Sequence, residues 1–240
     1  CYIMECEMNT YNTTAPTLEC ETGDKIIYPF SPPIFQSEVS QSFIDSLLHE
    51  GDKLTREKDD WRPKLAGNMK YGGSYVYKNE FTIKAEKYLL KYLDRFLHTI
   101  NKNFGPQQVE RLIQKSNFTQ EARQLPGGHQ GKIALDTIWI NYQKKHDYNP
   151  PHTHKGILSF VIFCKVPQKI FEQPAVSNTT DQGKILFQHG ESMTKLMGNL
   201  YPVTPYERLM FIFPADLNHF VPSFWTDETR VSVSGNFIVV

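Results

Sequence analysis

The chain has 240 residues, of which 40% are hydrophobic and 22% charged, a composition that excludes a disordered protein. Its 26 basic residues balance its 26 acidic residues, so no net charge favours nucleic acid or an anionic membrane as a partner. No apolar run reaches the roughly 18 residues of a membrane span, and the N-terminus lacks the order of a secretory signal. We therefore expect a cytoplasmic protein.

The first residues of the chain predict a leader followed by a helix. Residues 1–24 show no sustained hydrophobic period, and we expect them to be flexible. Ser37 can cap a helix that continues through Leu48, because the apolar residues between them follow helical spacing. Residues 51–63 are polar and charged, which predicts an irregular stretch and a candidate loop on the substrate side.

Two further helices are predicted before residue 130. Apolar residues recur at helical spacing over residues 82–103, and this helix should end before Gly105. A shorter helix is predicted over residues 109–113. Residues 25–130 are therefore expected to be a mainly helical support.

From residue 132 onward, short runs of Ile, Val, Phe and Tyr alternate with Pro, Gly, Asn and Asp. Many short strands after a few helices indicate an α+β fold, with a double-stranded β-helix (the jelly-roll barrel of cupins) over residues 131–240. Together with the helices this would be a single domain over residues 25–240. The predicted strands are 133–143, 156–166, 183–189, 207–213 and 229–240, with an edge strand or loop at 193–204.

The sharpest local feature is the pair His152 and His154, in a turn-rich stretch before an apolar strand. In an extended segment, residues two apart project to one face, so both imidazoles can converge on one point. Such a pair alone is more often two ordinary histidines than a metal site. His219 follows another apolar strand and could supply a third ligand. Three imidazoles with an open face suit catalytic iron, zinc, copper or nickel.

Arg230 opens the last predicted strand and shares one face with Ser232 and Ser234. A buried guanidinium needs an anion, and its planar fork matches a carboxylate, to which Ser232 could add a hydrogen bond. A surface ion pair with Asp227 or Glu228 is the simpler interpretation of Arg230 alone. Beside a metal site, a carboxylate anchor is the better one.

The order of these features resembles the 2-oxoglutarate- and Fe(II)-dependent oxygenases, and within them the prolyl-4-hydroxylase-like branch of bacteria and bacteriophages. The resemblance covers residues 130–240 well and the N-terminal half only in outline. It rests on Trp139 and Asn141, on residues 149–154 with the strand 158–162, on residues 183–187, on Phe213-Pro214 with His219 and Pro222, and on residues 230–236.

The resemblance implies that His152, His154 and His219 bind Fe(II), and that Arg230 grips the distal carboxylate of 2-oxoglutarate with help from Ser232. One residue departs from the family pattern, because the middle ligand is usually Asp or Glu. His154 therefore either binds the iron, which we prefer, or stays outside the coordination sphere while water completes it.

Similar enzymes also use a residue on the strand before the histidine pair to assist the co-substrate. Tyr142 is our candidate for this role, and Asn141 is the runner-up.

The activity implied is hydroxylation of a C–H bond, with 2-oxoglutarate and O2 consumed and succinate and CO2 released. A prolyl residue of a peptide or protein is the leading substrate, a small molecule stays open, and nucleic acid and membranes are not expected as partners. The loops 166–182 and 190–206 are natural substrate-selecting lids. Two alternatives remain: a cupin-like metalloenzyme that does not use 2-oxoglutarate, and a non-catalytic jelly-roll binding module.

Overall fold

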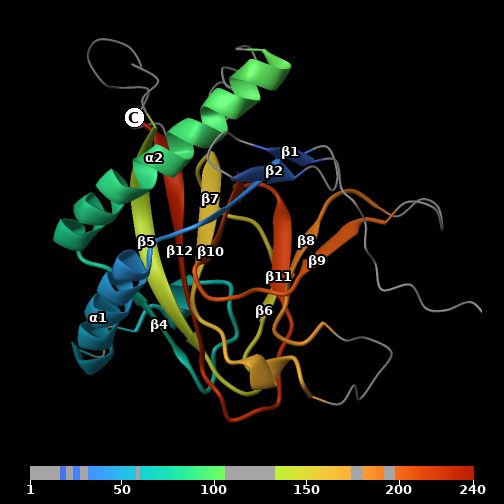
Figure 1. Ribbon diagram of the computed structural model, residues 1–240. Helices are drawn as coiled ribbons and strands as arrows, with labels where there is room; N and C mark the ends of the chain where they lie inside the picture. Colours follow the sequence, from blue (N-terminus) through green and yellow to red (C-terminus); the bar gives the residue numbers. More distant parts are fainter. Residues whose placement is uncertain are drawn as a thin grey trace, which may run out of the picture.

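Two antiparallel sheets and two α-helices make up the described part of this computed structural model (Figure 1). The described residues are 17–19, 24–27, 32–57, 60–105, 133–173, 181–191 and 198–240. The helices are α1 (Gln41–Glu57) and α2 (Asn79–Phe104), with 3₁₀ turns η1 (Arg62–Lys64) and η3 (Gln168–Ile170). Among the described residues, none of the helices has the length and apolar character needed to span a membrane.

The larger sheet has eight strands and the smaller sheet four. The larger one runs in the order β1 (Thr17–Glu19), β2 (Lys25–Ile27), β3 (Ile34–Glu38), β10 (Leu209–Pro214), β7 (Leu158–Lys165), β12 (Arg230–Val239), β5 (Ile133–Gln143) and β4 (Gly73–Val76). The smaller one runs in the order β6 (Asn149–His152), β11 (Asn218–Val221), β8 (Ile185–Gln188) and β9 (Leu200–Val203).

From β5 onward the chain passes back and forth between the two sheets. The strands β5, β7, β10 and β12 belong to the larger sheet, and β6, β8, β9 and β11 to the smaller one. This is the double-stranded β-helix that the sequence predicts. All five predicted strands are confirmed to within two residues at each end, and the expected edge element contains β9 at the edge of the smaller sheet.

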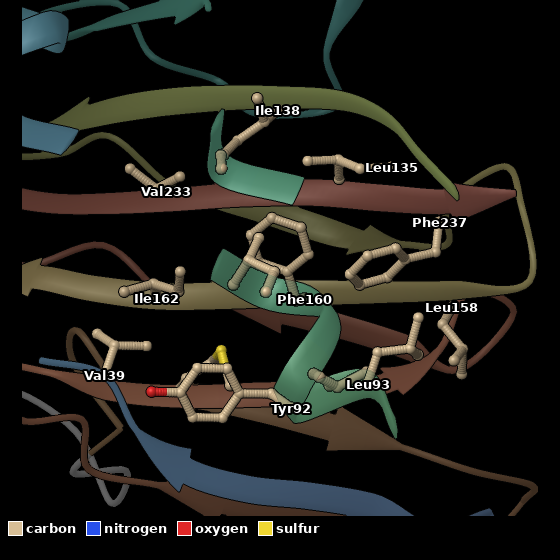
Figure 2. Packing of buried hydrophobic residues seen from close by; sticks show 14 of the residues in the cluster. Val39, Tyr92, Leu93, Leu135, Ile138, Leu158, Phe160, Ile162, Val233 and Phe237 are labelled. Carbon is tan, nitrogen blue, oxygen red and sulfur yellow. The ribbon is translucent and has the colours of Figure 1, made fainter. Parts of the chain in front are cut away.

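The two helices cover one face of the larger sheet, and α2 runs obliquely across β5, β12 and β7 (Figure 1). Alternate residues of each strand point to this face, so their apolar side chains pack against the helices. Figure 2 shows Tyr92 and Leu93 of α2 near the row formed by Phe160 and Phe237, whose ring centroids are 5.5 Å apart. Each fully buried side chain of this size contributes about 1.5–3 kcal/mol to stability.

The opposite face of the larger sheet packs on the smaller sheet. Phe187 of β8 meets Phe211 and Phe213 of β10 edge-on, at centroid distances of 5.6 and 5.1 Å. This second core holds the two sheets together, and the cavity beside it in the barrel interior is lined by both polar and apolar residues.

The N-terminal half holds more strands than the sequence predicted. The expected flexible leader contains β1, which pairs with β2. Ser37 does not cap a helix, because it lies in β3, where its Oγ donates to Asp24 Oδ1 at 2.5 Å. The helix begins at Gln41, four residues after Ser37, and Ser40 Oγ just before it accepts a hydrogen bond from Phe43 N at 3.3 Å.

The prediction of an irregular stretch over residues 51–63 was wrong for its first seven residues, because α1 continues to Glu57. Leu47, Gly51 and Leu54 extend the buried face of the helix at spacings of four and three residues. The helix predicted over 82–103 is confirmed as α2, and the one predicted over 109–113 lies outside the described residues.

Candidate metal centre

The smaller sheet brings three histidines together. His152 ends β6, and His219 lies directly opposite it on β11. His154 follows two residues after His152, and its backbone N–H donates to Ala215 O at 2.8 Å. Pairing of β6 with β11 and this one turn contact therefore fix all three positions.

The three imidazoles are close enough to share one metal ion. One ligand nitrogen of each lies within 4.8 Å of the others, and the Nε2 atoms of His154 and His219 are 3.1 Å apart. Metal–nitrogen bonds of about 2.0–2.1 Å fit such a spacing. The pair His152 and His154 and the distant His219 therefore lie together in the structure.

Backbone carbonyls orient two of the rings. His152 Nδ1 lies 2.8 Å from Pro150 O, and His219 Nδ1 lies 3.0 Å from Leu217 O. A carbonyl oxygen only accepts, so Nδ1 carries the proton in both rings and the lone pair of Nε2 is free for a metal. Such hydrogen bonds are the usual support of histidine ligands.

Burial keeps these histidines neutral. Loss of solvent lowers the pKa of His152, brings the pKa of His154 to about 4, and lowers the pKa of His219 well below its usual value. The neutral imidazole is the form that binds metal. The site therefore requires no further deprotonation at neutral pH.

A cavity of about 440 Å³ opens next to the histidines. Trp139 lines it, with its ring centroid 5.5 Å from that of His154. Trp61, near the end of the stretch 51–63, also lines it, as does Lys64 just beyond that stretch. No described residue of the loops 166–182 and 190–206 lines it, and residues 174–180 and 192–197 of these predicted lids lie outside the described residues.

Arg230 is a buried cation on the wall of this cavity. It is 3% exposed, its Nη1 donates to Gly183 O at 2.6 Å, and its Nε has no partner among the described residues. The alternative of a surface ion pair is not what the structure shows, because Asp227 pairs with Lys145 and Glu228 with Lys169.

Burial lowers the pKa of Arg230 to about 10, so the guanidinium stays charged at neutral pH. A buried charge without a partner is costly, and an acidic ligand would offset that cost. A guanidinium that forms no ion pair with any described residue, in the same cavity as three neutral imidazoles, fits a metal ion together with a carboxylate-bearing co-substrate.

The neighbouring strands supply polar groups beside Arg230. Ser232 lies opposite Asn141 in the pairing of β12 with β5, and both line the cavity, as does Ser234. Tyr142 does not: it lies on the other face of β5, where its hydroxyl donates to Asp52 Oδ1 at 3.2 Å. The prediction that Tyr142 lies in the site was therefore wrong. Neighbouring residues of a strand point to opposite faces, and it is Asn141, the second candidate, that lines the cavity.

The sequence gives no signal for several of the cavity residues. Ser74 lines the cavity from β4, a short strand that begins at Gly73, and no local sequence signal predicts the pairing of this strand with β5. Asp136 and Thr137 both line the cavity, because the register of β5 against β12 shifts by one residue there. Such a bulge re-aims a side chain and cannot be read from alternation.

The comparisons with known proteins agree with this geometry. Residues 137–236 match the family model described as "Putative 2OG-Fe(II) oxygenase". This segment contains His152, His154, His219 and Arg230. No curated protein gave a significant sequence match.

Solved structures share the fold. A crystal structure of a Pseudomonas putida prolyl-4-hydroxylase superposes with a TM-score of 0.54 at 13% identity, covering 88% of this chain and 94% of that one. JOX2, in complex with 2OG, Fe and JA, superposes with a TM-score of 0.51 at 12% identity, covering 86% and 68%. At such identities the likeness carries the fold alone, and it confirms the double-stranded β-helix.

Proposed function

We propose that this chain, whose residues 137–236 carry the core of a 2-oxoglutarate- and Fe(II)-dependent oxygenase, hydroxylates a C–H bond of a peptide or protein. In this proposal His152, His154 and His219 hold the iron, and Arg230 and Ser232 bind the distal carboxylate of 2-oxoglutarate. A prolyl residue is the leading target, a choice motivated by the similar Pseudomonas putida prolyl-4-hydroxylase.

One observation carries the proposal: three imidazole nitrogens within 4.8 Å of one another line the same cavity as a buried guanidinium. When bound, iron with 2-oxoglutarate and dioxygen supplies the oxidising power for hydroxylation, and succinate and CO2 are the co-products. The chain's own residues bind the iron and the co-substrate, orient the co-substrate, and exclude water from the site. The fork of Arg230 can form two parallel hydrogen bonds to a carboxylate, which fixes the direction of the co-substrate.

Aromatic rings pack beside two of the histidines, the buried His219 and the partly buried His154. The ring of Phe213 lies 4.9 Å from that of His219, and Trp139 lies 5.5 Å from His154. A dry site strengthens the attraction between the guanidinium and an incoming carboxylate, because the local dielectric is low. It also protects reactive species from side reactions with water.

The all-histidine ligand set changes the charge of the site. His154 occupies the place where similar enzymes carry a carboxylate, so the protein adds no negative charge to the iron. The ion keeps its full charge of two, which favours binding of a dianionic co-substrate.

An anaerobic titration tests the proposal. We expect a weak visible absorption band when 2-oxoglutarate is added to the Fe(II)-loaded protein, and none with succinate, which lacks the keto group. With oxygen and substrate present, succinate should form in a one-to-one ratio with hydroxylated product. Bound iron without a 2-oxoglutarate-dependent band would contradict the proposal.

The histidine triad also favours one other function, that of a cupin-like metalloenzyme that does not use 2-oxoglutarate. That function leaves the buried Arg230 and its neighbour Ser232 without a ligand. The same titration separates the two, because a cupin-like enzyme would bind the metal and ignore the 2-oxo acid. A non-catalytic binding module would take up no iron.

The prolyl assignment needs its own experiment. Synthetic peptides with Pro or Ala at one otherwise identical position would be incubated with iron, 2-oxoglutarate and oxygen, and analysed by mass spectrometry. We expect the Pro peptide alone to gain one oxygen atom and to stimulate succinate formation. Stimulation by both peptides would exclude the prolyl ring as the target while leaving the oxygenase activity intact.

A further inference from the structure

Three polar side chains form a row on the cavity wall, across three adjacent strands. Ser74 of β4 lies opposite Asn141 of β5, which lies opposite Ser232 of β12. Directly opposed residues point to the same face of a sheet, and all three line the cavity. They are 1%, 6% and 6% exposed, respectively. The row ends two residues from Arg230 along β12.

Ser74 fixes the orientation of the Asn141 side chain. Its Oγ donates to Asn141 Oδ1 at 2.8 Å, in a buried position. An amide whose oxygen is held in this way turns its Nδ2 to the opposite side. No described residue accepts a hydrogen bond from that Nδ2. The two N–H donors of Asn141 are therefore free for a ligand in the cavity.

We propose that Ser74 is a positioning residue for the co-substrate, acting through Asn141. By holding Oδ1, it keeps the amide N–H groups directed at an oxygen of the 2-oxoglutarate that Arg230 and Ser232 bind. A carboxylate oxygen only accepts hydrogen bonds, so a reversed amide would set two acceptors against each other. The inference rests on the proposed function, because it requires 2-oxoglutarate in this cavity.

The inference also assigns a task to the N-terminal half. Ser74 lies outside the segment 137–236 that matches the oxygenase family. It is held in place by β4 and by the backbone contact from Trp61 N to Ser74 O at 2.8 Å. The same short strand thus anchors the wall residue Trp61 and orients the amide of Asn141.

The test measures the dissociation constant of 2-oxoglutarate in the Fe(II)-loaded protein without oxygen, by the visible band. Ser74→Ala is expected to raise it about 10-fold, the size of one hydrogen bond to a charged group. Ser74→Thr should restore the wild-type value, because it keeps a hydroxyl and β-branched residues suit a strand. The dissociation constant of Fe(II) should stay unchanged in both variants.

A double-mutant cycle separates positioning from general loosening. If Ser74 acts through Asn141, then Ser74→Ala adds nothing to the loss caused by Asn141→Ala. Additive losses would overturn the proposal. Ser37→Ala is the matched control, since Ser37 Oγ donates to Asp24 Oδ1 at 2.5 Å in a buried position on the same sheet, and neither residue lines the cavity. An equal rise of the dissociation constant in that control would overturn the proposal as well.

Asn141→Asp tests the direction of the amide in a way that does not depend on the folding of Ser74→Ala. It replaces the N–H donors with a charged acceptor of the same shape, and we expect the dissociation constant of 2-oxoglutarate to rise by more than 10-fold. An unchanged value would overturn the inference but leave the proposed function intact. Failure of the wild-type protein to bind 2-oxoglutarate would instead overturn the proposed function.

Discussion

His219 lies directly opposite His152 in the antiparallel pair of β11 and β6, and their ring centroids are 4.4 Å apart. The pairing register itself therefore places two of the three candidate ligands. Each ring is also held by a carbonyl two residues before it, Pro150 O or Leu217 O. The site is preorganised by the backbone of the smaller sheet.

Replacing His219 by Ala should abolish stoichiometric Fe(II) binding. Loss of a direct ligand is expected to weaken binding by more than the roughly 10- to 100-fold typical for losing a supporting partner. The Fe(II) dissociation constant is measured by titration under anaerobic conditions. His49→Ala is the control, because His49 is exposed on α1 and should leave the constant unchanged. Wild-type affinity in the His219 variant would remove this residue from the metal site.

Most of the catalytic half could be predicted from the sequence, because its signals are local. Short runs of Ile, Val, Phe and Tyr bounded by Pro, Gly, Asn and Asp predicted each strand, and the spacing of His152 and His154 predicted their shared direction. Alternation also predicted that Arg230 and Ser232 share a face. These features depend on the period of the extended backbone, which neighbouring residues alone determine.

The parts that were missed depend on pairing between distant segments. The strand β4 is only four residues long, and Ser74 faces the cavity because of its register with β5. Tyr142 was misplaced for the same kind of reason: a one-residue change in position exchanges the two faces of a strand. The pairing of β4 with β5 decided the first case, and the choice of which face of β5 points to the cavity decided the second; a single sequence displays neither.

His154 should prove to be an iron ligand. We expect His154→Ala to weaken Fe(II) binding as strongly as His219→Ala does. His154→Asp should retain iron, because a carboxylate is also a suitable ligand. Its negative charge should weaken 2-oxoglutarate binding relative to the wild-type protein. Both constants come from anaerobic titrations. If His154→Ala keeps wild-type iron affinity, this histidine lies outside the coordination sphere.

Arg230→Ala should weaken 2-oxoglutarate binding while leaving Fe(II) binding unchanged. Hydrogen bonds to a charged group contribute about 1.5–3 kcal/mol each, so the loss of a bidentate contact predicts a rise of roughly 100-fold or more in the dissociation constant. Arg230→Lys keeps the charge but loses the fork, and we expect an intermediate value. Thermal unfolding of each variant monitors the fold. Parallel loss of iron and 2-oxoglutarate binding would indicate that Arg230 acts on the structure as a whole.

Gly72 allows the loop that carries Trp61 to pack on the end of β5. A Cβ at this position would lie 1.8 Å from the backbone oxygen of Tyr142 and 2.7 Å from Asp147 Oδ2. Asp147 is fully buried and joins the same two segments, because its Oδ1 accepts from Tyr71 N and its Oδ2 from Lys144 N. A backbone atom cannot move aside as a flexible side chain can, so Gly72→Ala should force the segments apart.

We expect Gly72→Ala to lower the free energy of unfolding by about 1–3 kcal/mol, the usual cost of overpacking. Denaturant titration measures this loss, and Gly198→Ala is the matched control, because a Cβ there meets no atom within 4 Å. Separation of the loop from β5 should also disturb Ser74, which accepts a hydrogen bond from Trp61 N. The variant should therefore bind 2-oxoglutarate less tightly while His152 and His219, held by their own strand pairing, still bind Fe(II). Wild-type stability would show that the loop shifts without cost and that Gly72 is not required for this packing.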